Sequence, residues 1–362
     1  MRRALVLAAT ALALLALPPL GSLPAGAAVD RVLAIDCRAA NDQCWPAAFA
    51  FTPNGNRVFY VERFTGQIRK HTLASNRDQQ WAVINDVAGS GEQGVLGITL
   101  DPRWSKAPKF RWVYVYYTHE SPLQNRILRL RKLAGGGMKK DLLQKLPAAS
   151  GYHNGGVIHI GPDKKLYAVT GEAHDPARAQ DKKDPAGKVL RLNLNGRRPG
   201  DNPIGGSKAF SYGHRNSFGF AFDPETDVLW QTENGPGCED EVNRILPGRN
   251  YGWGGNSNCP GTSTSGPNPV QPEWDTGNTT IAPTGAAFCD GCSLGPAPEG
   301  DFLFGAWNDG KIRRLVLNSA RNDVTGDFVV FDNPSGVMAV EAAPSGKIFF
   351  SDPFGIYRLK QS

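Results

Sequence analysis

Short apolar stretches separated by tight turns recur along the whole chain. Each copy of the pattern has an apolar strand, a turn built on proline with aspartate, asparagine or glycine, and a second apolar or aromatic strand. The chain contains 42 glycines and 27 prolines, which is typical of many short elements joined by turns. Five turns of this kind centre on Pro53, Pro102, Pro162, Pro224 and Pro344.

The spacing of these turns predicts the architecture. Successive turns lie roughly 50 to 60 residues apart, except that the last interval is twice as long. A degenerate sixth copy is therefore expected inside it, where residues 302–304 and 310–315 have the right pattern. This period is typical of propeller blades rather than of a solenoid or of paired β-sandwiches. We predict an all-β fold, a six-bladed β-propeller, in which a strand near residues 31–35 completes the last blade.

No linker divides the repeat, so residues 29–362 are predicted to form a single propeller domain. No long helical pattern is present, and residues 141–146 are expected to form one short helical turn at most. Ligands of propellers bind over the central channel, on loops between strands. The loops richest in polar residues and glycine lie within residues 150–253, in the third and fourth copies of the repeat, and we expect the site there.

The first 28 residues have the pattern of a signal peptide. Arg2-Arg3 precedes an apolar run over residues 4–17, and Ala25-Gly26-Ala27 is a small-x-small cleavage signal. This predicts export to the periplasm or the extracellular space without stable membrane insertion, and a retained anchor is the alternative. Without the two arginines the formal charge falls from +6 to +4, and the basic residues are scattered, so no nucleic-acid partner is expected.

Six cysteines follow the signal peptide, an even number that suggests disulfides in an exported protein. Six cysteines allow 15 connectivities, and nearness in the sequence favours three local pairs. A Cys-x-x-Cys pair could instead be redox-active or contribute half of a metal site, although no second such pair exists. The favoured pairs are Cys37–Cys44, Cys238–Cys259 and Cys289–Cys292.

Histidine, arginine and asparagine in the region from 150 to 253 are the candidates for catalysis. His153 lies among glycines, where a ligand can approach closely and a neutral imidazole can take a proton from a hydroxyl group; a turn histidine bonded to a carbonyl is the alternative. His159 lies inside a predicted strand, where a structural role is favoured. Arg215 and Asn216 offer donors for a carboxylate or an oxyanion, and a salt bridge between blades is the alternative for the arginine.

The turn that begins at Asn234 is the candidate for a cation. Proline has no N–H, so the Asn234-Gly235-Pro236 turn presents carbonyl oxygens, which hard cations prefer. Three acidic residues follow at 239–241, and Tyr251 lies a little further on. These groups could hold Ca²⁺, and a solvated acidic turn is the alternative. No histidine or cysteine cluster has zinc spacing, and no glycine-rich loop has dinucleotide-binding or P-loop spacing.

The same region resembles the soluble glucose/sorbosone (aldose sugar) dehydrogenases that depend on pyrroloquinoline quinone (PQQ). Many motifs match in the same order over about one hundred residues, and such a run is more specific than any one motif. They include His153-Asn154-Gly155-Gly156, Gly161-Pro162-Asp163, Gly187-Lys188-Val189-Leu190-Arg191, Asp201-Asn202-Pro203, Gly213-His214-Arg215-Asn216, Asn234-Gly235-Pro236 and Asn250-Tyr251-Gly252-Trp253. The family's fold is a six-bladed propeller, in agreement with the repeat.

The resemblance implies an oxidoreductase that oxidises the anomeric carbon of aldose sugars with PQQ and Ca²⁺ as cofactors. His153 matches the general base, and Arg215 matches a residue that stabilises charge on the quinone oxygen. The electron acceptor is not identified. The positions that match cofactor contacts are Glu92, His153, Arg215, Asn216, Asn234 and Thr280. The positions that match metal contacts are Gly235 and Pro236 for the ion at the cofactor, and Glu241 and Tyr251 for a second, structural ion.

The chain departs from the glucose-oxidising members at several positions. Glu92 and Asn234 stand where those enzymes have glutamine, and Glu172 replaces an aspartate. Their late blades supply basic residues to the cofactor's carboxylates, whereas Asn308 and residues 336–338 are not basic here. A second hypothesis is therefore a redox-inactive propeller that binds carbohydrate or protein, related to hedgehog-interacting-protein-like domains. A calcium-dependent lactonase is a third.

Overall fold

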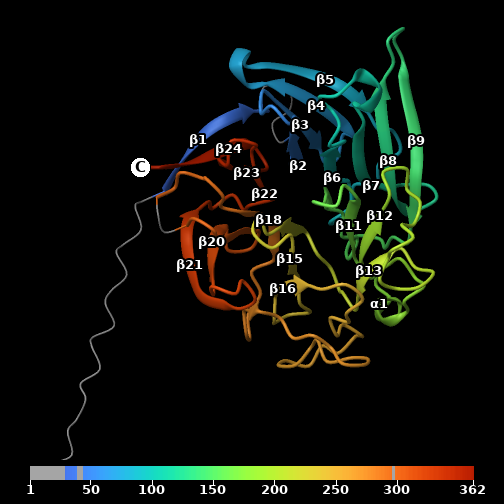
Figure 1. Ribbon diagram of the computed structural model, residues 1–362, viewed down its shortest axis with the longest axis vertical. Helices are drawn as coiled ribbons and strands as arrows, with labels where there is room; N and C mark the ends of the chain where they lie inside the picture. The colour runs from blue at the N-terminus through green and yellow to red at the C-terminus, as the bar shows by residue number, and fades with distance from the viewer. Residues whose placement is uncertain (1–28, 39–43, 296–297) are drawn as a thin grey trace, which may run out of the picture.

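The structure, a computed structural model, describes residues 29–38, 44–295 and 298–362. In this part of the chain six four-stranded antiparallel sheets are arranged as blades around a central axis (Figure 1). The prediction of an all-β, six-bladed propeller is confirmed. The predicted signal peptide, residues 1–28, lies outside the described residues. Among the described residues, no helix has the length and apolar character needed to cross a membrane.

Each blade consists of strands that are consecutive in the sequence, except for the last blade. Blade one contains β2 (Pro46–Phe51), β3 (Arg57–Glu62), β4 (Gln67–Thr72) and β5 (Arg77–Val83), and blade two contains β6 (Val95–Leu100), β7 (Val113–His119), β8 (Gln124–Lys132) and β9 (Met138–Leu146). Blade three contains β10 (Ile158–Ile160), β11 (Leu166–Thr170), β12 (Lys188–Leu192) and β13 (Ala209–Tyr212), and blade four contains β14 (Gly219–Phe222), β15 (Leu229–Glu233), β16 (Glu241–Ile245) and β17 (Trp274–Asp275). Blade five contains β18 (Pro283–Phe288), β19 (Phe302–Ala306), β20 (Lys311–Leu317) and β21 (Val324–Asp332). Blade six contains β22 (Ala339–Ala342), β23 (Ile348–Asp352), β24 (Gly355–Gln361) and the N-terminal strand β1 (Val29–Asp36).

Blade six closes the ring by combining the two ends of the described chain. Strand β1 pairs antiparallel with β24 from Val29 opposite Gln361 to Asp36 opposite Gly355. This confirms that the N-terminal strand completes the last blade. The degenerate copy expected between Pro224 and Pro344 is blade five, which contains both predicted segments in β19 and β20.

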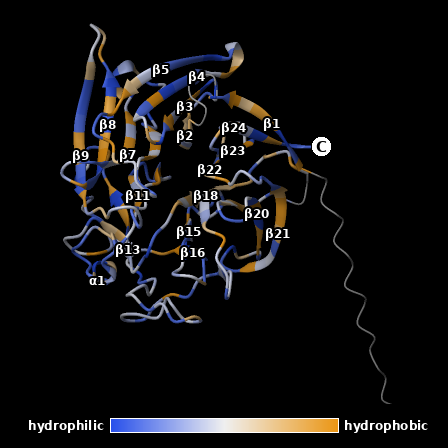
Figure 2. Cartoon of the chain, turned by 180° about the vertical axis from the view of Figure 1, so that it is seen from behind, coloured by the Kyte–Doolittle hydropathy of each residue, from blue (hydrophilic) through white to orange (hydrophobic). Residues whose placement is uncertain are grey.

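The hydrophobic core is divided into layers between neighbouring blades. Each of six clusters of buried side chains joins two adjacent blades, such as the cluster that packs Phe59 of blade one against Val113 of blade two. Figure 2 shows the hydrophobic residues concentrated on the strands. The inner strands are covered on both faces, so their buried positions are continuous instead of alternating, as in β7, where every residue is buried.

The expectation of a helical turn over residues 141–146 is wrong. This segment belongs to β9, the outermost strand of blade two, which pairs with β8. Its outer face meets solvent, so Leu142 is exposed while Gln144 and Leu146 are buried. The resulting pattern of apolar residues does not alternate as a half-buried strand normally does. Helical structure in the described residues is limited to α1 (Pro176–Gln180) and the short 3₁₀ turns η1 (Leu73–Ser75) and η2 (Pro108–Phe110).

All three predicted disulfide pairings are present in the structure. They join Cys37 to Cys44, Cys238 to Cys259 and Cys289 to Cys292. Each closes a local loop, and the second joins the turn after Asn234 to the long loop that follows β16.

Candidate functional site

The central channel of the propeller opens at one end into a cavity of about 490 Å³. The first strands of neighbouring blades contact one another around the axis, as β2, β6, β18 and β22 show in Figure 1, and the loops that enter these strands contribute to the cavity wall. Two of the predicted site residues, Glu92 and Asn234, line the cavity directly. The rest of the wall includes Trp45, Arg63, Phe64, Tyr152, Phe218, Ala282, Thr284, Trp307, Asn308 and Met338.

Glu92 connects three loops beside this cavity. Its Oε2 accepts hydrogen bonds from the backbone N–H of His153 (2.7 Å) and from Nδ2 of Asn216 (3.0 Å). Oδ1 of Asn216 accepts a further bond from the backbone N–H of Gly155 (3.1 Å). One carboxylate of blade two therefore joins blades three and four. It fixes the backbone that carries His153.

His153 forms a buried acid–base pair with Glu172. Its Nδ1 lies 2.6 Å from Oε1 of Glu172, and Glu172 is 1% exposed. The imidazole also stacks on His174, with ring centroids 4.3 Å apart. In the neutral imidazole, a proton on Nδ1 would donate to this carboxylate and leave the lone pair on Nε2, which could then accept a proton.

The role of Glu172 was missed in the sequence, where it was noted only as a replacement for aspartate. The sequence feature that could have indicated its position beside His153 is the Gly171-Glu172 turn. A Cβ atom on Gly171 would lie 2.1 Å from the carbonyl oxygen of His153, so no larger residue fits at that position. This close approach of two backbones brings the carboxylate within reach of the imidazole.

Arg215 is a partly buried cation beside the cavity-lining Asn234. Its Nη1 donates to the carbonyl oxygen of Asn234 (2.8 Å), its backbone N–H donates to Glu233, and its guanidinium lies 5.3 Å from the ring centre of Trp253. Its Nε is buried and has no hydrogen-bond partner among the described residues. Burial lowers the pKa of Arg215, although nearby carboxylates, led by Glu172, oppose this shift. A desolvated cation of this kind would gain from an anionic group in the adjacent cavity.

The Asn234-Gly235-Pro236 turn presents unused carbonyl oxygens. In the described chain, no hydrogen bond ends on the carbonyl oxygen of Gly235 or Pro236. The turn is held by the buried Asp240, whose Oδ1 accepts from the N–H of Gly235 (2.8 Å) and whose Oδ2 accepts from the N–H of Ile281 (2.6 Å). A Cβ atom at position 235 would lie 1.9 Å from the carbonyl oxygen of residue 238, so this turn requires glycine.

A model of the glucose/sorbosone dehydrogenase family matches residues 43–353 of the chain. The chain belongs to this family. It is 32% identical over 245 residues to quinoprotein glucose dehydrogenase B of Acinetobacter calcoaceticus, covering 58% of this chain and 50% of that protein. It is 28% identical over 218 residues to the aldose sugar dehydrogenase YliI of Escherichia coli, covering 58% of each. The chain thus spans about half the length of these two curated relatives.

The solved structures extend the likeness over almost the whole chain. The PQQ-bound form of aldose sugar dehydrogenase from Streptomyces coelicolor is 27% identical, with a TM-score of 0.79. The match covers 94% of this chain and 99% of that one. The family resemblance inferred from the ordered motifs is confirmed, and the propeller extends beyond the stretch that carries most of those motifs.

The structure does not bring every predicted residue of this glucose/sorbosone dehydrogenase family member to the cavity. Thr280 is exposed, and Ala282 and Thr284 line the wall in its place. Glu241 is buried and accepts hydrogen bonds from Ser263 (2.6 Å) and Asn243 (2.9 Å). Burial, with a smaller effect of neighbouring carboxylates, raises the pKa of Glu241 to about 8.

Tyr251 uses its hydroxyl group within its own loop. The hydroxyl donates to the carbonyl oxygen of Arg244 (2.6 Å) and accepts from the N–H of Leu246 (2.7 Å), so a metal contact from Tyr251 would have to use its carbonyl oxygen. Among the described residues, the one group of three acidic, histidine or cysteine side chains close enough to share an ion is Cys289, Cys292 and Glu299. Its two cysteines are joined in a disulfide, which removes them as thiolate ligands.

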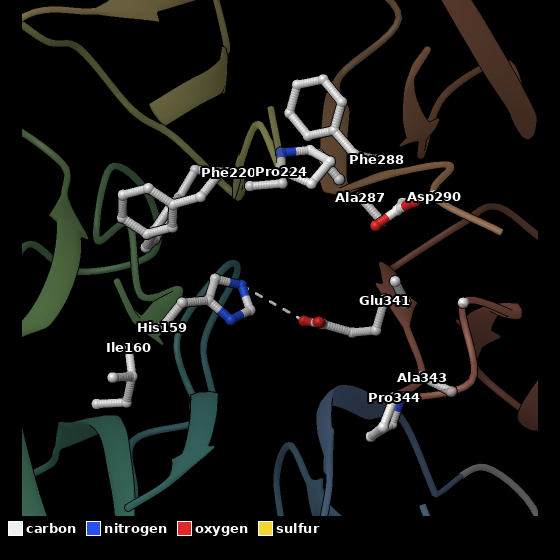
Figure 3. A pocket seen from close by; sticks show the side chains of 15 residues that line it. His159, Ile160, Phe220, Pro224, Ala287, Phe288, Asp290, Glu341, Ala343 and Pro344 are labelled. Atoms are coloured by element: carbon white, nitrogen blue, oxygen red, sulfur yellow. Dashed lines mark ion pairs between the residues drawn. The ribbon is translucent and has the colours of Figure 1, made fainter. Parts of the chain in front are cut away.

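A second cavity of about 350 Å³ lies further along the first strands, and a narrow neck lined by Ile98, Val157 and Met338 separates the two. His159 of β10 and Glu341 of β22 meet in this second cavity, with Nε2 and Oε1 3.4 Å apart (Figure 3). Burial lowers the pKa of His159 to about 4 and raises that of Glu341 well above its usual range. The pair belongs to the wall of the channel, in line with the structural role favoured for His159.

Proposed function

We propose that the protein is a PQQ- and calcium-dependent dehydrogenase that, after export, oxidises the anomeric carbon of aldose sugars. The observation that carries the proposal is the network of Glu92, His153, Asn216 and Glu172 beside a cavity that two partly buried arginines also flank. The matched family and the quinoprotein relatives support it. They do not favour the redox-inactive alternative.

The residues around the cavity fit both cofactors. A volume of about 490 Å³ is within the range of small-molecule sites, roughly 300 to 1,000 Å³. Arg63 and Arg215 offer positive charge to an anionic quinone, and the free carbonyl oxygens of Gly235 and Pro236 suit a hard cation such as Ca²⁺. When bound, PQQ and Ca²⁺ supply two-electron acceptance at a quinone carbonyl that the cation polarises.

The chain's own residues would then prepare the sugar for oxidation. Nε2 of His153 would take the proton of the anomeric hydroxyl group, the O–H electron pair would form the second C–O bond, and the C–H electron pair would leave as hydride to the bound two-electron acceptor. The Glu172 carboxylate stabilises the imidazolium that forms. Arg215, which is largely desolvated, stabilises negative charge in the adjacent cavity more strongly than an exposed arginine would.

The mouth of the cavity suits a sugar ring. Three of its wall residues are exposed aromatic side chains: Tyr152 is 56% exposed, and Phe64 and Trp307 are each 39% exposed. Aromatic faces of this kind cover the C–H faces of sugars. The exposed mouth also leaves room for an electron acceptor to approach.

The proposal is tested by adding PQQ and Ca²⁺ to the purified apoprotein and following dye reduction with a panel of aldoses. Quinone-dependent dye reduction with at least one aldose is expected, together with a rise in thermal stability on adding PQQ. His153→Ala should lower turnover at least ~100-fold, since general-base catalysis contributes about that much. Absence of both dye reduction and thermal stabilisation would overturn the proposal, and stabilisation without turnover would indicate a binding propeller.

A further inference from the structure

Arg63 is a cavity residue to which neither the motifs nor the family resemblance assigned a role. It follows β3 directly, in the turn Glu62-Arg63-Phe64-Thr65-Gly66, and lines the cavity of about 490 Å³. It is the one lysine or arginine among the residues described as lining that cavity.

The guanidinium of Arg63 is held in a fixed position by its neighbours. Nε donates to the carbonyl oxygen of Gln93 (2.9 Å), and Nη2 donates to the carbonyl oxygen of Gly91. Gly94 has a φ of +136°, and a Cβ atom there would lie 2.5 Å from Cγ of the arginine. The loop before β6 is therefore shaped around this side chain. Of its five N–H donors, these two bonds leave three without a partner among the described residues.

Arg63 also has no carboxylate partner among the described residues. The buried Arg191 and Arg321 form ion pairs at 2.7 and 2.6 Å, whereas no ion pair within 4.0 Å involves Arg63 in this part of the chain. Burial lowers the pKa of Arg63 to about 10, although the charge of Glu92 opposes this shift. Oε2 of Glu92 is already used by His153 and Asn216. A fixed, desolvated cation with spare donors indicates an anionic ligand.

The wall around Arg63 favours a flat anion. The ring of Phe64 lies under its guanidinium at 4.8 Å, and Trp45 contacts both Phe64 and Trp307, with centroids 5.6 and 5.7 Å apart. Planar aromatic surfaces beside a guanidinium suit a planar conjugated carboxylate better than a sugar acid, whose ring is puckered and largely polar.

We propose that Arg63 binds a carboxylate of PQQ. It thereby supplies, from blade one, positive charge that Asn308 and Met338 of blades five and six do not offer to the same cavity. The inference rests on the proposed function. It makes Arg63 a cofactor-binding residue that acts before any sugar is present.

The test compares the wild type with Arg63→Gln and Arg63→Lys, using the apoprotein with excess Ca²⁺. Quenching of tryptophan fluorescence reports binding, because Trp45 and Trp307 line the cavity. The two ligands are PQQ and its trimethyl ester, which keeps the ring system and removes the negative charges. Arg57→Gln is the matched control, because Arg57 is exposed and begins the same strand whose far end precedes Arg63.

Arg63→Gln should raise the Kd for PQQ at least tenfold, Arg63→Lys should restore part of the affinity, and Arg57→Gln should have no effect. The wild type and Arg63→Gln should bind the trimethyl ester equally, because the charge contact is absent from both. Equal weakening for both ligands would mean that the substitution only reshaped the loop, and would overturn the inference. So would unchanged PQQ affinity combined with selective loss of turnover on sugar acids.

The failure of the proposed function has a different signature in this experiment. In that case the wild type would bind neither ligand, and the inference about Arg63 would fall with it. If the wild type binds PQQ and Arg63→Gln binds it as tightly, the proposed function stands and the inference alone fails.

Discussion

At the scale of single residues, the candidate site depends on two carboxylates that hold His153 in position by hydrogen bonds. Glu92 orients the backbone of His153, and Glu172 orients its ring. The sequence led to His153, Arg215 and Asn216 because they lie in ordered family motifs. It did not indicate the role of Glu172 or the position of Arg63, because those follow from backbone contacts between loops that are distant from each other.

Glu172→Gln is expected to keep the fold and lower kcat about 10- to 100-fold, since the neutral amide no longer stabilises the imidazolium of His153. Steady-state kinetics with PQQ, Ca²⁺ and an aldose measures this effect.

Asp175→Asn is the matched control, because Asp175 lies on the same loop but pairs with Arg178 at a largely exposed position. It should leave kcat unchanged. A Glu172→Gln enzyme with the wild-type kcat would show that the carboxylate does not act through His153.

At the scale of elements, the inner strands of the blades could be predicted, whereas β1 is the one outermost strand of the described blades that was expected. Inner strands are buried on both faces, so their apolar runs stand out between proline turns. The outermost strands face solvent on one side, and β9 shows how this weakens the pattern. Side chains that connect loops are harder still to find, and Lys188 at the start of β12 is an example.

Lys188 of blade three forms hydrogen bonds with the segment around α1. Its Nζ donates to the carbonyl oxygens of Arg178 (2.7 Å), Ala179 (3.1 Å) and Ala186 (2.6 Å), and the side chain is fully buried. Lys188→Met keeps the apolar stem but leaves the carbonyl group of Ala186 unpaired, while those of Arg178 and Ala179 keep bonds from the N–H groups of Asp181 (3.1 Å) and Gly213 (2.9 Å). An unpaired buried group costs about 1 to 3 kcal/mol, so the free energy of unfolding should fall by at least ~1 kcal/mol.

Urea unfolding followed by circular dichroism measures this difference. The exposed Lys183 of the same segment provides the control, and Lys183→Met should change the unfolding free energy by less than ~0.5 kcal/mol. Equal effects of the two substitutions would mean that the hydrogen bonds of Lys188 do not hold the segment.

At the scale of the whole molecule, the propeller is a ring of similar interfaces around one channel. A periodic sequence reveals the number of blades, because each core layer joins only adjacent blades. The channel is different, because its wall combines side chains from every blade at positions that no local pattern marks. The sequence therefore predicted the ring, and the family resemblance pointed to Glu92, Asn234 and Asn308, which line the cavity. It did not predict the cavity wall of blade one, or the pairing of His159 with Glu341.

The pairing of His159 with Glu341 predicts how the stability of the ring depends on pH. Burial raises the pKa of Glu341 in the folded protein, whereas the unfolded chain releases that proton near 4.5. Its contribution to stability is therefore complete below about pH 4.5 and is lost as the pH rises through the raised value. Glu341→Gln lacks this proton, so its free energy of unfolding should increase relative to the wild type as the pH rises, by at most ~1.4 kcal/mol per pH unit.

Urea unfolding of the two proteins between pH 5 and pH 8 measures this difference, and the exposed Glu120 provides the control, since Glu120→Gln should follow the wild type. His159, whose pKa burial lowers to about 4, favours the folded state increasingly as the pH rises toward 6.5, but it does so in both proteins and largely cancels in the comparison. If the pair were instead a charged ion pair at neutral pH, removing its carboxylate would make Glu341→Gln the less stable protein there. The direction in which the difference changes between pH 5 and pH 8 therefore decides whether the channel carries a neutral pair or a salt bridge.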